Sequence, residues 1–188
     1  MSHGKEVQNQ ARRLSSTLTD LLSSTQPHDA QLLPVDGGRL IQRTVAILRP
    51  SFNRLGHRLE TQIDPRCPPL LVDEEWLVQV LINLVVNSEE ALRNSGCTCV
   101  QLHPDPDRPD QANLEVIDNG IGMAPEVLAR VGEPFYTTRE RGTGLGLAMS
   151  RDLVARMGGT LTIRSEVSIG TTVRLALRTV AQADRELI

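Results

Sequence analysis

The sequence is poor in aromatic side chains. Its 188 residues include only Phe52, Trp76, Phe135 and Tyr136. The core must therefore be aliphatic, and a hydrophobic share of 39% is enough for one domain of ordinary size. Runs of lysine and arginine are also lacking, and 20 basic against 23 acidic residues give a net charge of −3. This balance argues against nucleic acid as a partner.

Paired cysteines and long apolar runs are missing too. Cys67, Cys97 and Cys99 lack the CxxC spacing of a zinc site, so we expect idle thiols in a reducing compartment. A metal site from Cys97, Cys99 and His103 is the alternative. The amino terminus has no signal-peptide core, and no window approaches the roughly 18 apolar residues of a membrane span. We expect a cytoplasmic chain without a membrane segment, although the parent protein can be membrane-anchored.

A first amphipathic helix is predicted for residues 5–25. Apolar or small residues recur there at alternating spacings of four and three, which is the seam of a heptad helix. A lone helix cannot bury such a seam, so this segment needs a partner, for example in a homodimer. Pro27 then breaks the pattern. We therefore divide the chain into a helix and linker at 1–29, a main domain at 30–180 and a tail at 181–188.

The main domain mixes helices and strands without strict alternation. Helices are predicted for residues 36–49, where Pro50 ends or kinks the pattern, for 73–94 with Asp73 as cap and Gly96 as stop, for a short stretch near Glu126, and for the segment from the glycine-rich stretch to Gly158. Strands are predicted for 58–63, 97–103, 112–118, 160–166 and 170–178. This order favours an α+β sandwich of one sheet and one helical layer.

The predicted helix 73–94 carries a polar stripe. Val80, Asn83, Asn87 and Glu90 recur at spacings of three and four, so two carboxamides and a carboxylate share one face. Asparagine is a middling helix former that is costly to bury without partners. The stripe indicates a hydrated cation or polar ligand against this face, and simple exposure to solvent is the alternative.

A second candidate site lies at the end of the predicted strand 112–118. Asp118 closes this strand and is followed by Gly120 and Gly122. A carboxylate there can accept a hydrogen bond from an exocyclic amine such as that of adenine, whereas the carbonyl oxygen of guanine would be repelled. The glycines would let a flat ring lie against the chain. An ordinary turn would show the same pattern.

A third candidate site is the stretch "ERGTGLGLAMS" at residues 140–150. Three alternating glycines precede a helix whose free N–H groups and dipole favour an anion, and Arg139 and Arg141 stand just before them. The stretch suits a polyphosphate. It is neither GxxxxGK[ST] nor the GxGxxG turn of dinucleotide-binding folds.

Together these segments resemble one family. In order, "NLVVN", "DNGIGM", "EPFYTTR" and "GTGLGLA" are similar to the asparagine, first glycine, phenylalanine and second glycine boxes of the sensor histidine kinase ATP-binding domain in the GHKL group. "GTTVRLAL" resembles its last glycine-threonine box. The resemblance covers about residues 30–180. It implies a two-layer Bergerat sandwich with a mixed sheet of about five strands and three helices on one face.

The resemblance also implies the ligands and the site. ATP and Mg²⁺ would lie between the polar-striped helix and a lid at about 132–143, with Asn87 on the metal, Asp118 on the adenine amino group and Phe135 as packing anchor of the lid. Asn83, Arg139 and Arg141 would face the phosphates. Thr171 would support the Asp118 carboxylate through water. The remaining implied contacts are Gly120, Gly122 beneath the ring, Thr143, Gly144, Leu145, Gly146 and Leu147.

The phosphoacceptor of the family has no counterpart here. The family phosphorylates a histidine in an H box, and none of His3, His28, His57 and His103 has that surrounding sequence. Residues 5–25 instead resemble the second dimerisation helix. We therefore expect a protein histidine kinase domain that binds ATP but depends on a separate histidine-containing dimerisation domain, with a response regulator downstream.

Two functions are compatible with the resemblance. Asn83 stands where other GHKL ATPases carry a glutamate that activates water, and an amide cannot act as that base. This difference favours phosphotransfer over hydrolysis. The alternative is a nucleotide-responsive binding module without kinase activity, in which ATP changes the affinity for a partner.

Overall fold

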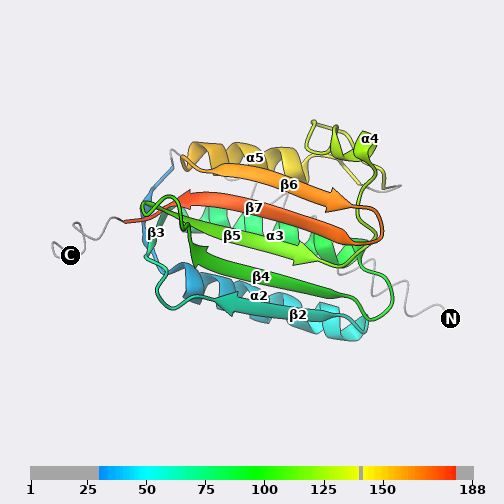
Figure 1. Cartoon of the computed structure of the whole chain (residues 1–188), viewed down its shortest axis with the longest axis horizontal. Coiled ribbons are helices and arrows are strands. Elements are labelled where there is room, and N and C mark those ends of the chain that lie inside the picture. The colour runs from blue at the N-terminus through cyan, green and yellow to red at the C-terminus, as the bar shows by residue number, and fades with distance from the viewer. Residues whose placement is uncertain (1–29, 140–141, 181–188) are drawn as a thin grey trace.

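A five-stranded sheet with helices on one face forms the body of the molecule (Figure 1). The computed structural model describes residues 30–139 and 142–180. The elements in chain order are β1 (Leu33–Val35), α2 (Gly37–Arg54), β2 (Arg58–Ile63), β3 (Leu70–Val72), α3 (Glu74–Ala91), β4 (Cys97–Pro104), β5 (Gln111–Asp118), α4 (Pro125–Leu128), α5 (Gly146–Arg156), β6 (Thr160–Glu166) and β7 (Gly170–Arg178).

The sheet is mixed, with strand order β2-β4-β5-β7-β6. β2 and β4 pair in parallel, and β3 and α3 form the crossover between them. The other three pairs are antiparallel. Register places Asp118 opposite Thr98 on one side and Thr171 on the other. The start of the first glycine box, at the end of β5, and the glycine-threonine box on β7 therefore meet at one end of the sheet.

The core lies between the sheet and the helical layer of α2, α3 and α5, which lie behind the strands in Figure 1. It is almost entirely aliphatic, as the composition predicts. Phe52 on α2 and Trp76 on α3 are its aromatic members. The predicted α+β sandwich, with about five strands and three helices on one face, is confirmed. The predicted helix 5–25 lies outside the described residues, as do residues 181–188.

Aspartates begin the two long helices. The Asp73 carboxylate accepts a hydrogen bond from the backbone N–H of Trp76 at 3.1 Å, as predicted, and Asp36 accepts one from Arg39 N–H at 2.9 Å. Each bond satisfies one of the N–H groups that the first turn of a helix leaves free.

None of the described helices is both long and apolar enough to cross a membrane.

The predicted helix ends differ from the observed ones. α2 continues through Pro50 to Arg54, because Phe52 reaches the core at 1% exposure. Pro50 and Ala46 are both exposed, so water can solvate the Ala46 carbonyl group that proline leaves unbonded. α3 ends at Ala91 instead of residue 94, since Leu92 turns to an extended conformation and is itself buried.

A small second sheet was not predicted. β1 and β3 pair antiparallel over three residues each, in segments for which the sequence predicted no strand. Strands this short show no usable alternation, and the nearby prolines argue for a loop. Their pairing depends on tertiary contacts and not on local preference. The predicted strand bounds of β2, β6 and β7 agree with the structure.

Candidate nucleotide-binding site

The Asp118 carboxylate ends β5 and is held by backbone groups. Its Oδ1 accepts hydrogen bonds from Gly120 N–H at 2.8 Å and from Thr171 N–H at 3.2 Å. Burial raises the pKa of Asp118, and these two bonds act against the rise. Within the described part of the chain, Oδ2 has no hydrogen-bond partner, so one carboxylate oxygen stays available to a donor.

Contacts of the chain with itself explain Gly122. Its φ is +64°, and a Cβ at this position would lie 1.9 Å from the Glu166 carbonyl oxygen. The loop after Asp118 therefore packs directly on the turn between β6 and β7. Thr171 contacts Asp118 directly through its backbone N–H, and its hydroxyl group bonds Ser165 Oγ at 2.9 Å. The support through water that the resemblance implies stays a prediction.

The two asparagines of α3 form a chain of hydrogen bonds. Asn83 Nδ2 donates to Ser150 Oγ on α5 at 2.8 Å, and Asn83 Oδ1 accepts from Asn87 Nδ2 at 3.3 Å. This bond directs Asn87 Oδ1 away from Asn83 and towards Arg139. Both asparagines are half-buried, so the alternative of simple solvent exposure is wrong. Ser150 was missed by sequence reasoning, although it lies one helical turn beyond Gly146.

The amino terminus of α5 has no side-chain cap. Its N-cap residue is Leu145, in contrast to the aspartates that cap α2 and α3. The N–H groups of the first turn are therefore available to an anion. Thr143 Oγ1 accepts a weak bond from Leu145 N–H at 3.4 Å. Gly146 allows close approach of α3, because a Cβ there would lie 2.4 Å from Asn83 Oδ1.

A backbone hydrogen bond joins Phe135 in the predicted lid to Gly144 directly after it. Phe135 N–H donates to the Gly144 carbonyl oxygen at 3.1 Å, and Gly144 has φ +67° with no room for a Cβ. Phe135 is not the packing anchor that we expected, since 74% of it is exposed. Its own positive φ of 66° turns the chain, and the neighbouring Tyr136 packs instead, with the Arg130 guanidinium 4.1 Å from its ring centre.

The two lid arginines have different outcomes. Arg139 bonds the Asn87 side chain and forms an ion pair with Glu90, so it reaches the polar stripe of α3. Arg141 lies outside the described residues, and its phosphate contact stays a prediction. Leu147, like Gly144 and Leu145, is half-buried beside the start of α5.

The residues present fit a magnesium ion bound with a nucleotide. Asn87 offers a hard amide oxygen, oriented by the bond from its own Nδ2 to Asn83. Mg²⁺ prefers oxygen ligands and keeps several waters, with substrate phosphates completing its shell. No cluster of three or more His, Cys, Asp or Glu occurs among residues 30–139 and 142–180, so the alternative metal site of Cys97, Cys99 and His103 is not formed.

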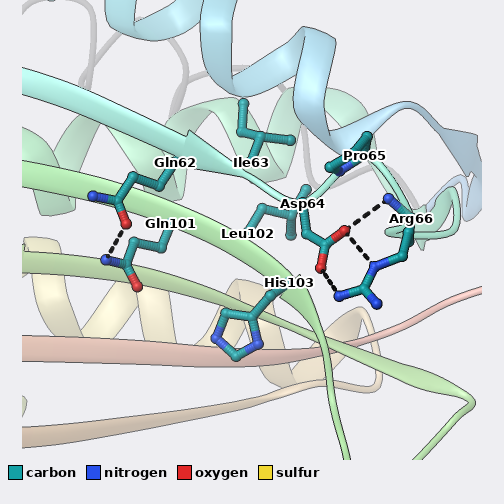
Figure 2. Close-up of a pocket in the computed structure, with 8 residues that line it drawn as sticks. All are labelled: Gln62, Ile63, Asp64, Pro65, Arg66, Gln101, Leu102 and His103. Atoms are coloured by element: carbon teal, nitrogen blue, oxygen red, sulfur yellow. Dashed lines mark hydrogen bonds and ion pairs between the residues drawn. The ribbon is translucent and has the colours of Figure 1, made fainter.

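A separate cavity of about 550 Å³ lies on the other face of the sheet (Figure 2). Gln101 and His103 line it and alternate along β4 with residues buried under the helices. Arg66 bonds both oxygens of Asp64, at 3.0 and 2.7 Å, and this pairing lowers the pKa of Asp64 to about 2. The charges of Asp64 and Arg66 therefore neutralise each other in the wall of this cavity, which lies away from Asp118.

The site unites an acceptor carboxylate at a strand end, a carboxamide pair on a helix and an uncapped helix terminus that follows the predicted lid. This combination, on a mixed sheet backed by three helices, defines a GHKL ATP-binding domain. The chain belongs to the family described as histidine kinase-, DNA gyrase B-, and HSP90-like ATPase, whose model matches residues 72–181. Within this family it is a histidine kinase-type ATP-binding domain.

Several of the similar proteins are named as kinases. Sporulation kinase E of Bacillus subtilis (strain 168) is 29% identical over 171 residues, which cover 91% of this chain and 23% of that protein. Sensor histidine kinase ZraS of Escherichia coli (strain K12) is 30% identical over 168 residues, covering 89% and 36%. The crystal structure of full-length ShkA in complex with AMPPNP matches with a TM-score of 0.76 and 26% identity, covering 96% of this chain and 39% of that chain. The chain thus spans 23–36% of these curated relatives.

Proposed function

We propose that this domain binds Mg-ATP and transfers the γ-phosphoryl group to a histidine on a dimerisation domain that the 188 residues do not complete. The observation that carries the proposal is the Asp118 carboxylate. Its Oδ1 is saturated by two backbone N–H groups, whereas Oδ2 has no partner among the described residues. A half-buried acceptor of this kind matches the exocyclic amine of adenine, and it disfavours the carbonyl oxygen of guanine.

The phosphates would lie between α3 and the start of α5. Arg139 supplies positive charge from the lid, and the uncapped N–H groups of Gly146 and Leu147 supply donors. Asn87 would hold the metal, with Asn83 fixing the orientation of its amide. Bound Mg²⁺ would supply charge neutralisation between the terminal phosphates. Thr143 and Gly144 shape the backbone that leads into this helix.

The chemistry needs few protein groups. An imidazole nitrogen of the acceptor attacks the γ-phosphorus, the bond to the bridging oxygen breaks, and ADP leaves with the electron pair. The domain's residues position the nucleotide and stabilise charge. Asn83 has no carboxylate with which to activate water, and its amide is engaged by Ser150 and Asn87. The site therefore favours transfer to an external nucleophile over hydrolysis.

A reconstitution experiment tests the proposal. The chain is mixed with γ-labelled ATP, Mg²⁺ and a separately produced H-box helical hairpin, and acid-labile phosphate on the hairpin is measured. Transfer supports the kinase, with a response regulator as the next acceptor. ATP binding without transfer supports the nucleotide-responsive module. A hairpin whose histidine is replaced by glutamine is the control, since label on that hairpin would show that the acceptor is another residue.

A further inference from the structure

Arg139 occupies the oxygen that the metal is proposed to use. Its Nη1 donates to Asn87 Oδ1 at 2.7 Å, and its Nη2 donates to the Asn87 carbonyl oxygen at 3.2 Å. The same Nη1 forms an ion pair with Glu90 Oε2. The guanidinium is thus held on α3 by three oxygens from two residues.

Asn87 has one side-chain oxygen, and its orientation is fixed because Nδ2 is bonded to Asn83. A magnesium ion lies about 2.1 Å from its ligand oxygens. A metal on Asn87 Oδ1 would therefore lie next to the positive guanidinium that bonds the same oxygen. Two cations in contact with one oxygen in a half-buried site repel each other strongly. The metal and Arg139 cannot share this oxygen as the structure has it.

We propose that Arg139 competes with the divalent cation for Asn87 Oδ1, and that Glu90 is the positioning residue that keeps the arginine there. This inference rests on the proposed Mg-ATP function. Glu90 lies three residues after Asn87 on the same face of α3, and its side chain is 30% exposed beside an Arg139 side chain that is 43% exposed. Without the carboxylate, only neutral oxygens would hold the guanidinium.

This positioning role explains why Glu90 belongs to the polar stripe of α3. Asn83 orients the Asn87 amide, and Glu90 retains the arginine that covers its oxygen. When a metal-bound nucleotide displaces Arg139, the guanidinium stays near the phosphates because Glu90 remains within reach. Glu90 thereby sets how much metal is needed for nucleotide binding, without contacting the nucleotide itself.

The test is the magnesium dependence of ADP binding in Glu90→Gln, measured by calorimetry at low ionic strength. ADP is used because it lacks the terminal phosphate that Arg139 is proposed to contact. An exposed ion pair is worth little, so the Kd for Mg-ADP is expected to fall about two- to fivefold. The Kd for ADP in EDTA should be unchanged, and the gain in affinity should shrink at high salt.

Glu74→Gln is the matched control. Glu74 lies on the same helix in an exposed ion pair with Arg43, thirteen residues or about 20 Å from Asn87, so the same charge change there should leave Mg-ADP binding at the wild-type value. A second readout is the Asn87 side-chain amide signal in nitrogen-15 NMR. Mg²⁺ alone should shift this signal at lower concentration in Glu90→Gln than in wild type.

The outcomes separate this inference from the proposed function. If wild-type ADP binding depends on Mg²⁺ and Glu90→Gln shows the same or weaker Mg-ADP affinity, the competition is overturned while the metal site stands. If wild type binds ADP with no magnesium dependence, the metal role of Asn87 fails, and the competition fails with it. A gain in affinity that persists in EDTA also overturns the competition, because it would not involve the metal.

Discussion

Replacing Asp118 with asparagine tests the adenine contact most directly. Both backbone donors, Gly120 N–H and Thr171 N–H, point at Oδ1. In Asp118→Asn the amide oxygen must keep this place, because an NH₂ group there would face two N–H donors. The new Nδ2 then takes the position of Oδ2. It presents a donor to the amino group of adenine, which is also a donor.

The expected loss follows from the cost of an unmatched hydrogen bond to a charged group. That cost is about 1–3 kcal/mol, so the Kd for ATP should rise roughly 5- to 150-fold. The same exchange favours the carbonyl oxygen of guanine. GTP affinity should therefore rise while ATP affinity falls, so the ratio of the two affinities should change by a larger factor than the ATP affinity does. A general loss of folding would weaken both and leave the ratio unchanged.

The stability of this variant should change in the opposite direction. Burial raises the pKa of Asp118, so its stabilising contribution is present below the ordinary carboxyl pKa and is lost as pH rises through the folded value. At pH 7 the wild type carries a half-buried charge that asparagine lacks. Asp118→Asn is expected to melt at higher temperature than wild type at pH 7, and this difference should vanish at low pH.

Calorimetry with ATP and GTP, together with thermal unfolding at both pH values, provides the measurement. Asp107→Asn is the matched control, because Asp107 is exposed in the loop at the opposite end of the β4–β5 hairpin. Asp107→Asn should change neither the nucleotide affinities nor the melting temperature. Unchanged ATP affinity in Asp118→Asn would remove this carboxylate from the site, and a lower melting temperature at pH 7 would refute the account of its burial.

Three further predictions concern the metal, the first glycine box and the ion pair between Asp64 and Arg66. Asn87→Ala should abolish the magnesium dependence of ATP binding in calorimetry, and persistence of that dependence would exclude Asn87 as the ligand. Gly122→Ala should lower the free energy of unfolding in urea by about 2–4 kcal/mol, from a left-handed backbone and overpacking together. Gly56→Ala, with φ +74° and no atom within 4 Å, should lose only the backbone part, and equal losses would contradict the packing argument. Asp64, held at a pKa of about 2 by Arg66, stabilises the fold above the ordinary carboxyl pKa and loses this effect as pH falls through about 2. Arg66→Gln should return its pKa towards the ordinary value in a carbon-13 NMR titration, and an unchanged value would exclude the ion pair as the cause.

Much of the fold could be predicted because its signals are local. Alternation defined β2, β6 and β7 to the residue, and the Asp73 cap placed the start of α3. The end of α2 could not be read in the same way. Pro50 is a local signal for a helix end. The burial of Phe52 in the core, which is a tertiary contact, outweighs this signal. The pairing of β1 with β3 likewise had no local signal.

The candidate site divides along the same line. Asn83, Asn87 and Asp118 could be named as candidates because helical spacing and the end of a strand are properties of the chain alone. Phe135 was assigned the wrong packing role, since exposure depends on which way a turn with positive φ directs the side chain. Ser150 and the ion pair between Glu90 and Arg139 were not predicted, because they join α3 to segments 49 to 67 residues away.

The sequence by itself determined the class of protein, the polar stripe of α3 and the glycines that surround the site, because these are matters of residue type and spacing. Only the tertiary structure decided which oxygen of Asp118 is left for a ligand and which cation covers Asn87. The physical reason is that hydrogen bonds are short and directional. Their pairing across distant segments is fixed only when the sheet and helices bring those atoms together.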